Sequence, residues 1–268
     1  MVRSVSIAAL TTTLVFTLIA QEPTKEPVKP APVKYKSNDR TRPRPKVIDP
    51  GTPSTADLPG KPPSDAVILF DGSKDLSEWY RSGKKPDAED AVPNWKIENG
   101  YAEIKGGAIN SKKKFGDVQL HIEWATPKEV KGNDQGRGNS GVYLGGFGEV
   151  QILDSFQNDT YPDGQAAGLY GKFPPLVNAC RKPGEWQTYD IIAHLPRTDE
   201  SGKVIRSGRL TVLHNGVLVH HSVEFNGKFG EYQIHIQDHG NPVRFRNIWV
   251  RQLADYDVES TPAPEKKK

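Results

Sequence analysis

Carboxylate and amide side chains that could perform chemistry lie close together in the segment Glu149-Val-Gln-Ile-Leu-Asp154 of this 268-residue sequence. Of two carboxyl groups at short spacing, one can act as the acid and the other as the base when their surroundings give them different pKa values. Side chains alternate along a strand, so Glu149 and Asp154 should point to opposite sides unless the strand bends or ends before Asp154. A retaining-glycosidase pair is therefore not established, although Gln151 shares the predicted face of Glu149.

A second segment, residues 237–240, places Asp238 and His239 side by side, and Arg244 and Arg246 follow closely. A histidine beside a carboxylate can remove a carbon-bound proton, and a nearby cation can hold the resulting enolate. In the structural alternative, Asp238 and His239 bond to turn amides, and the arginines form surface ion pairs. The sequence leaves both interpretations open.

A glycine-rich loop, Gly136-Arg-Gly-Asn-Ser-Gly141, leads into a predicted strand. Glycines permit close backbone approach, so Asn139 and Ser140 could be aimed into a cleft. A simple turn is the alternative interpretation. The loop is not a phosphate loop, because the Gly-Lys-Ser/Thr ending is missing.

All seven histidines lie in the central part of the chain, but none has a chelating spacing. Neither His-x-His nor His-Glu-x-x-His occurs, and His220 and His221 should point to opposite faces of one strand. The sequence therefore disfavours a metal site. No cofactor is expected, and a structural divalent ion is left open.

The apolar residues from Val67 onward recur with period two in short runs between Gly, Asn, Asp and Pro, which indicates strands. Asn99-Gly100 and Asn215-Gly216 are typical of tight hairpin turns. No stretch has a capped helical period, so we expect an all-β, two-sheet antiparallel jelly-roll sandwich. The predicted strands are Trp95–Glu98, Tyr101–Lys105, Val118–Ala125, Gly141–Gly145, Glu149–Asp154, Trp186–Leu195, Arg209–His214, Val217–Val223, Tyr232–Gln237 and Val243–Leu253.

The polar half of this alternation is rich in Glu, Gln and His, which can exchange hydrogen bonds or protons. Neighbouring strands of this kind would form a concave surface suited to sugar hydroxyls. An ordinary solvated strand face is the alternative. The polar sets are Gln119, His121 and Glu123, then Glu149 and Gln151, then Gln233, His235, Gln237 and His239.

Both ends of the chain differ from the body in composition. Residues 1–20 have the layout of a secretory signal with a cut after Ala20, so we expect export to the periplasm or the extracellular space. An uncleaved N-terminal anchor is the alternative interpretation. Residues 21–63 hold 11 of the 22 prolines and predict a disordered Pro/Lys-rich linker. Residues 64–253 would be the sandwich, and residues 254–268 a disordered tail.

The charge distribution argues against a nucleic-acid-binding domain. The whole chain has a formal net charge of +3, but residues 64–253 hold 23 Lys and Arg against 24 Asp and Glu, a net charge of −1. A nucleic-acid-binding fold would carry its basic patch on the fold itself. The basic linker could still touch an anionic envelope surface, or it could serve only for solubility. The oligomeric state is not predicted.

An ordered series of motifs through the body resembles the 3-keto-disaccharide hydrolase domain family. The series covers about Val67 to Leu253. It comprises Leu69-Phe-Asp-Gly72, Leu76-Ser-Glu-Trp79, Asn139-Ser-Gly-Val142, Glu149-Val-Gln-Ile-Leu-Asp154, Gly168-Leu-Tyr-Gly171, Pro183-Gly-Glu-Trp-Gln-Thr-Tyr-Asp190, Leu213-His-Asn-Gly-Val217, Gln237-Asp-His-Gly240 and Val243-Arg-Phe-Arg-Asn-Ile-Trp249.

The resemblance implies a concanavalin A-like fold and an enzyme acting on glycosides oxidised to a ketone at C3. Such a ketone acidifies the hydrogen at C2, so a base can remove it, the group at C1 leaves, and water adds. On this implication Glu149 or His239 is the base, with Arg246 or Arg244 holding the enolate. The expected sugar contacts are Asn139, Ser140, Tyr143, Gln151, Gln237 and Asp238, and Asp154 has the least defined catalytic role.

A non-catalytic carbohydrate-binding module on an envelope stalk is the alternative function. The same polar face and five tryptophans could bind sugar without cleaving it. Trp124, however, points to the same side of its predicted strand as the apolar residues, which predicts that it packs in the core.

Overall fold

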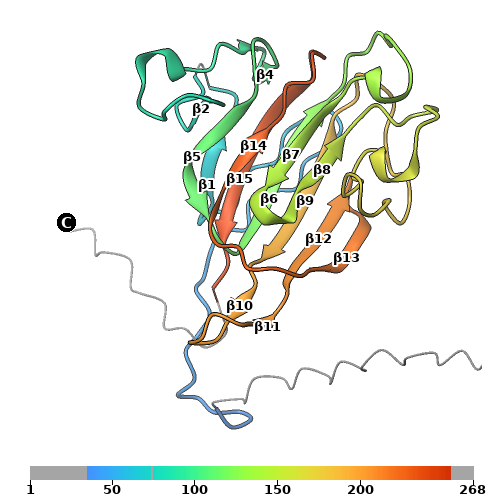
Figure 1. The fold of residues 1–268 in the computed structure, drawn as a ribbon. Helices are drawn as coiled ribbons and strands as arrows, with labels where there is room; N and C mark the ends of the chain where they lie inside the picture. The colour runs from blue at the N-terminus through green and yellow to red at the C-terminus, as the bar shows by residue number, and fades with distance from the viewer. Residues whose placement is uncertain (1–34, 74, 255–268) are drawn as a thin grey trace, which may run out of the picture. The chain divides into compact units, whose positions relative to one another are not determined.

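The computed structural model describes residues 35–73 and 75–254, which form an all-β, antiparallel sandwich of two main sheets, with a separate two-stranded sheet (Figure 1). The larger sheet has the order β13-β12-β9-β6-β15-β4-β3, and β1 also pairs with β15. The five-stranded sheet has the order β2-β5-β14-β7-β8. The expected signal at residues 1–20, residues 21–34 of the linker and residues 255–268 of the tail lie outside the described residues.

The elements are short and are joined by turns, as the spacing of Gly, Asn, Asp and Pro predicts. None of the helices in residues 35–73 and 75–254, which are single 3-10 turns, is long and apolar enough to cross a membrane. The strands are β1 Val67–Phe70, β2 Trp79–Arg81, β3 Lys96–Glu98, β4 Tyr101–Glu103, β5 Ile109–Phe115, β6 Val118–Ala125, β7 Ser140–Leu144, β8 Glu149–Ile152, β9 Gln187–His194, β10 Arg197–Thr198, β11 Val204–Arg206, β12 Gly208–His214, β13 Val217–Phe225, β14 Tyr232–Ile236 and β15 Arg244–Gln252; the 3-10 turns are η1 Glu89–Ala91, η2 Asp134–Gly136, η3 Gly145–Phe147 and η4 Pro162–Gly164.

The two predicted Asn-Gly turns are confirmed. Asn99 and Gly100 have φ of 49° and 77°, and Asn215 and Gly216 have φ of 53° and 78°. They join β3 to β4 and β12 to β13. Positive φ at both central positions matches the right-handed twist of the paired strands.

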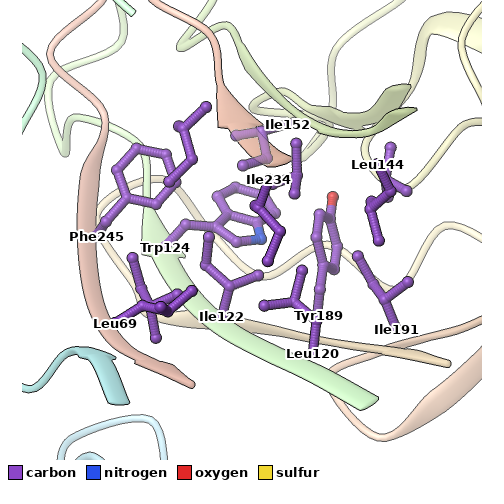
Figure 2. Close-up of a cluster of buried hydrophobic side chains, with 14 of the residues drawn as sticks. Leu69, Leu120, Ile122, Trp124, Leu144, Ile152, Tyr189, Ile191, Ile234 and Phe245 are labelled. Atoms are coloured by element: carbon purple, nitrogen blue, oxygen red, sulfur yellow. The ribbon is translucent and has the colours of Figure 1, made fainter. Parts of the chain in front are cut away.

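The core lies between the two sheets and is built from the apolar half of each alternation (Figure 2). Trp124 of β6 is fully buried beside Tyr189 of β9, as its parity predicted. Ile152 and Ile234 approach this cluster from the five-stranded sheet. The opposite half of each alternation must therefore point away from the core on both sheets.

Strand β5 is absent from the sequence prediction, because its interior does not alternate in the usual way. Only Ile109 and Phe115 supply large apolar side chains, and the three lysines at positions 112–114 are exposed. Pairing with β2 and β14 defines it as a central strand of its sheet. The short β1, β2, β10 and β11 are likewise additions to the predicted set.

Residues 49–64 are a hydrogen-bonded loop on the larger sheet, where the sequence predicted a disordered linker. Thr52 N donates to Lys61 O at 2.9 Å, and Ser64 N donates to Asp49 O at 2.9 Å, which closes the loop. Ser54 Oγ donates to the buried Glu123 Oε1 at 2.6 Å. Proline content alone indicated a spacer, whereas polar anchors hold this part in place.

Candidate functional site

Polar side chains from β7, β8 and the C-terminal end of β14 lie on the outer side of the five-stranded sheet. The residues between them are buried in the core, so these side chains point outward. The register places Tyr143 opposite both Glu149 and His235. We call this surface the Glu149 face; its members are Tyr143, Glu149, Gln151, His235 and Gln237.

Glu149 is half-buried and hydrogen-bonded at the centre of this face. The Tyr143 hydroxyl donates to Glu149 Oε2 at 2.7 Å. Burial raises the pKa of Glu149 above its usual value, and the Tyr143 hydrogen bond only partly opposes this shift. A Cβ atom at Gly141 would lie 2.0 Å from Glu149 Oε1, so this position of the carboxylate requires glycine. A partly desolvated carboxylate is well suited to accept a proton.

A cluster of side-chain amides adjoins Glu149. Gln151 Nε2 donates to Gln135 Oε1 at 3.0 Å, and Asn139 Nδ2 donates to the Gln135 backbone carbonyl at 2.7 Å. Asn139 is only 3% exposed, yet its Oδ1 has no hydrogen-bond partner among residues 35–73 and 75–254. Gln237 Nε2 donates to the Tyr143 hydroxyl at 3.2 Å. Asn139 and Gln151 are buried and donate to Gln135, so the half-buried Gln237 is the amide of this cluster that can reach a sugar hydroxyl.

His235 lies beside Tyr143 on the same face. Its Nδ1 is 2.8 Å from Asn110 Oδ1, and its ring meets the Tyr143 ring edge-on at a centroid distance of 5.2 Å. Burial lowers the pKa of His235. The imidazole is therefore neutral at pH 7, and the amide oxygen at Nδ1 leaves Nε2 as a hydrogen-bond acceptor.

Two exposed tyrosines border this face. Tyr170 N donates to Glu149 O at 3.2 Å, and the preceding Leu169 is buried and bridged to Val150, so Tyr170 points outward. Its hydroxyl is hydrogen-bonded to the Tyr161 hydroxyl, and each of the two residues is 41% exposed. Exposed aromatic rings of this kind can pack against the apolar face of a sugar.

The two predicted arginines lie on the opposite side of the sandwich from Glu149. Arg246 Nε donates to Glu123 Oε2 at 2.8 Å, and its guanidinium lies 4.2 Å from the centroid of the Trp186 ring. Arg244 is paired with a glutamate of β4 at 3.2 Å. The expectation that either arginine stabilises an enolate next to Glu149 is wrong. Both do share one face of β15, but β15 belongs to the other sheet.

The segment after β14 matches the structural alternative rather than the catalytic one. The strand ends at Ile236, so the alternation does not extend to His239. His239 is exposed and forms no hydrogen bond, ion pair or ring contact within the described ranges. Asp238 accepts hydrogen bonds from the backbone N–H groups of Gly107 and Gly240, each at 2.8 Å. Asp238 therefore fixes turns, and no contact holds His239 as a base on the Glu149 face.

Asp154 and Ser140 also serve local structure. Asp154 is buried beyond the end of β8 and pairs with Arg137 Nε at 2.7 Å, so its charge is already compensated. It lines an end pocket of about 520 Å³ that Arg137 and Arg244 also line. The Ser140 hydroxyl donates to the Gln237 carbonyl at 2.7 Å and ties two strands together.

In the part of the chain that the structure describes, no group of three His, Cys, Asp or Glu side chains is arranged to hold a metal ion.

Residues 65–251 match the model of the family described as the 3-keto-alpha-glucoside-1,2-lyase-like domain. The chain belongs to this family. A curated relative, the 3-keto-disaccharide hydrolase of Bacteroides thetaiotaomicron, is 27% identical over 249 residues, covering 70% of this chain and 78% of the relative.

Two solved structures from Parabacteroides distasonis are similar to this chain. The first, a candidate glycosyl hydrolase, has a TM-score of 0.71 and 38% identity, covering 85% of this chain and 100% of its own. The second, also a candidate glycosyl hydrolase, has a TM-score of 0.52 and 20% identity, covering 71% and 94%. At that lower identity, the second match shows the fold alone.

Three residues that the sequence analysis did not assign to the site lie on or beside the Glu149 face. Tyr170 lies within the motif Gly168-Leu-Tyr-Gly171, but nothing in that motif shows that it continues the sheet next to β8. Tyr161 contacts Tyr170 from a separate loop, which no local pattern predicts. His235 could have been found from the sequence, because it lies two residues before Gln237 and so points to the same side of the predicted strand.

Proposed function

We propose that this chain cleaves glycosides that carry a ketone at C3, with Glu149 as the base that removes the C2 proton. The family description and the name of the Bacteroides relative support the substrate class and a sugar-cleaving activity. The half-buried, hydrogen-bonded Glu149 on a polar outer face is the observation that carries the mechanism.

The proposed reaction begins with transfer of the C2 proton to Glu149. The electron pair of the C2–H bond forms a C2–C3 double bond, and the negative charge moves to the C3 oxygen. Collapse of this enolate restores the ketone, forms a C1–C2 double bond and breaks the bond from C1 to the leaving oxygen. The proton on Glu149 reaches that oxygen directly or through the Tyr143 hydroxyl. Water then adds across C1 and C2.

Neutral donors would stabilise the enolate, since the arginines lie on the other sheet. The Gln237 side-chain amide has two hydrogens, and only one is directed at the Tyr143 hydroxyl. The buried amides of Gln151 and Asn139 donate to Gln135 and hold the neighbouring part of the cluster in place. Donors already fixed by neighbouring contacts need little reorganisation as charge develops. An acid partner next to Glu149 is not needed, because the ketone supplies the electron sink.

The experiment is incubation with a 3-keto-glucoside in deuterated water. Elimination followed by hydration predicts product that carries deuterium at C2, and Glu149→Gln should abolish its formation. Cleavage with the C2 hydrogen fully retained would contradict the proposal. Saturable sugar binding with no turnover would favour the alternative, a carbohydrate-binding module.

Export is part of the same proposal. It rests on the signal layout of residues 1–20, which would direct the chain to the periplasm or the extracellular space. Comparing the N-terminal residue of the protein in the periplasmic and cytoplasmic fractions tests this expectation. A cytoplasmic protein that keeps Met1 would contradict it.

A further inference from the structure

The outer face of the larger sheet holds a second pocket, of about 370 Å³, beside the 49–64 loop. His121, Thr188 and Trp249 contribute from the sheet, and Thr52 and Lys61 contribute from the loop. The buried residues between these sheet positions face the core, so this pocket and the Glu149 face lie on opposite sides of the sandwich. The volume is within the range of small-molecule sites.

The floor of the pocket is a fixed set of charges. His121 Nδ1 lies 2.8 Å from Asp190 Oδ1, and His121 Nε2 lies 3.6 Å from Glu123 Oε1. Burial alone would lower the pKa of His121, but the hydrogen bond to Asp190 and the nearby Glu123 carboxylate raise it to about 9. The His121 ring also stacks on Trp249 at a centroid distance of 5.0 Å. The floor is therefore rigid, and His121 is an imidazolium at neutral pH.

The succession of Asp190, His121 and Ser54 resembles a hydrolase triad in order but not in chemistry. Ser54 Oγ is 3.5 Å from His121 Nε2, yet it donates at 2.6 Å to Glu123 Oε1. A protonated histidine cannot accept the serine proton. Ser54 therefore anchors the 49–64 loop, and the pocket is a candidate for binding rather than for acyl transfer.

Arg181 is the lining cation that lacks a carboxylate partner. The charge of Lys61 is compensated by Asp49 at 3.3 Å, and that of His121 by its two carboxylates. Arg181 Nη1 donates to the Trp186 carbonyl at 2.6 Å, which holds the side chain. Its Nε and Nη2 have no partner within residues 35–73 and 75–254. This free edge presents two parallel donors, the arrangement that binds a carboxylate in a bidentate manner.

Two further polar groups of the pocket are without partners among the described residues. These are the Thr188 hydroxyl and Asp190 Oδ2, whose companion Oδ1 contacts His121. Both residues point outward from β9 on either side of the buried Tyr189. A hydroxyl and a carboxylate oxygen suit the hydroxyl groups of a sugar ring.

We infer that this pocket binds a sugar acid, with the carboxylate on the free edge of Arg181 and ring hydroxyls on Thr188 and Asp190. The inference does not depend on the proposed function, because the pocket and the Glu149 face share no residue. A sugar acid bound in this pocket would lie on the opposite side of the sandwich from the Glu149 face.

Calorimetric titration of the full chain tests the inference with methyl β-glucuronide, methyl β-glucoside and sodium acetate as probes. Saturable binding of the glucuronide is expected, with both other probes about tenfold weaker or more. Arg181→Ala should weaken glucuronide binding by about tenfold or more, and Thr188→Val by a few-fold.

Glu149→Gln is the matched control on the opposite face and should leave glucuronide binding unchanged. Unfolding temperatures establish that each variant is folded; if Arg181→Ala is not, Arg181→Lys replaces it, because it keeps the charge but loses the two-donor edge. Absence of glucuronide binding, equal binding of glucoside or acetate, or a folded Arg181 variant with unchanged affinity would each overturn the inference.

Discussion

The Tyr143 hydroxyl and the Glu149 carboxylate are joined by a 2.7 Å hydrogen bond across neighbouring strands β7 and β8. The register places the two residues directly opposite each other, so the contact follows from strand pairing rather than from a flexible loop. Such a pair keeps the carboxylate in one orientation while burial raises its pKa. The predictions on activity below follow from this geometry.

Replacing the base should remove catalysis without unfolding the protein. Glu149→Gln keeps the size of the side chain but cannot accept the C2 proton, so we expect kcat to fall by about 10²–10⁴-fold. Because burial disfavours the charged form, the unfolding temperature should not fall. Steady-state kinetics and thermal unfolding test both expectations; full activity of a folded Glu149→Gln variant contradicts the assignment.

Gly141 offers a test of position rather than of chemistry. Gly141→Ala adds a Cβ 2.0 Å from the present site of Glu149 Oε1, and the backbone of Gly141 is not in the left-handed region. We expect the carboxylate to swing away, with a loss in kcat of about tenfold or more, because small misplacements are costly in catalysis. The unfolding temperature should change little. Unchanged kcat would show that the present carboxylate position is not the active one.

The pH profile should depend on the Tyr143 hydrogen bond. Glu149 must be ionised to act, so kcat/KM should rise with pH through a pKa above that of an ordinary glutamate. The Tyr143 hydroxyl opposes this shift by stabilising the ionised form, so Tyr143→Phe should move the acid limb to still higher pH. A limb that stays in place or moves to lower pH in Tyr143→Phe contradicts the pairing.

The tyrosine pair should contribute to substrate binding. Tyr170→Ala removes the ring next to Glu149 and should raise KM by several-fold with a smaller change in kcat, because base and substrate chemistry are untouched. Tyr170→Phe keeps the ring but loses the bond to Tyr161, so its KM should stay near that of the wild type. Equal effects of the two substitutions would assign the role to the hydroxyl instead.

Buried His214 should make the fold sensitive to acid. Burial lowers the pKa of His214 to about 3, so the neutral form contributes stability above pH 6.5 that is lost as the pH falls toward 3. At pH 4.5 the wild type should have lost about 2–3 kcal/mol relative to pH 7 from this group. Denaturant unfolding of His214→Gln at both pH values should show a smaller loss. If His214→Gln loses as much stability between pH 7 and pH 4.5 as the wild type does, His214 is not the source of the acid sensitivity.

Strand alternation predicted which side chains share a face, but not which sheet each strand joins. The parity of Glu149 and Gln151 was correct, and so was that of Arg244 and Arg246. Only strand pairing, which brings together residues distant in the sequence, separates the two pairs onto opposite faces. Parity also fails beyond a strand end, which is why His239 does not follow His235.

The 49–64 loop shows that amino-acid composition alone does not distinguish a disordered linker from an ordered loop. Its prolines are compatible both with a solvated spacer and with a rigid loop, and the distinction depends on partners elsewhere in the chain. The buried Glu123, which is fully covered, supplies the anchor for Ser54. A strand position 69 residues away therefore decides the structure of this loop.

Proton exchange at C2 tests the role of Glu149 most directly. A 3-keto-1,5-anhydroglucitol carries only its ring oxygen at C1 and has no glycosidic group to lose there. In deuterated water, proton NMR can therefore follow exchange of its acidic hydrogens separately from glycoside cleavage. The account predicts enzyme-dependent exchange at C2 that slows by about 100-fold or more in Glu149→Gln. Equal exchange by the wild type and the folded variant, or none above the uncatalysed rate with wild type, would contradict it.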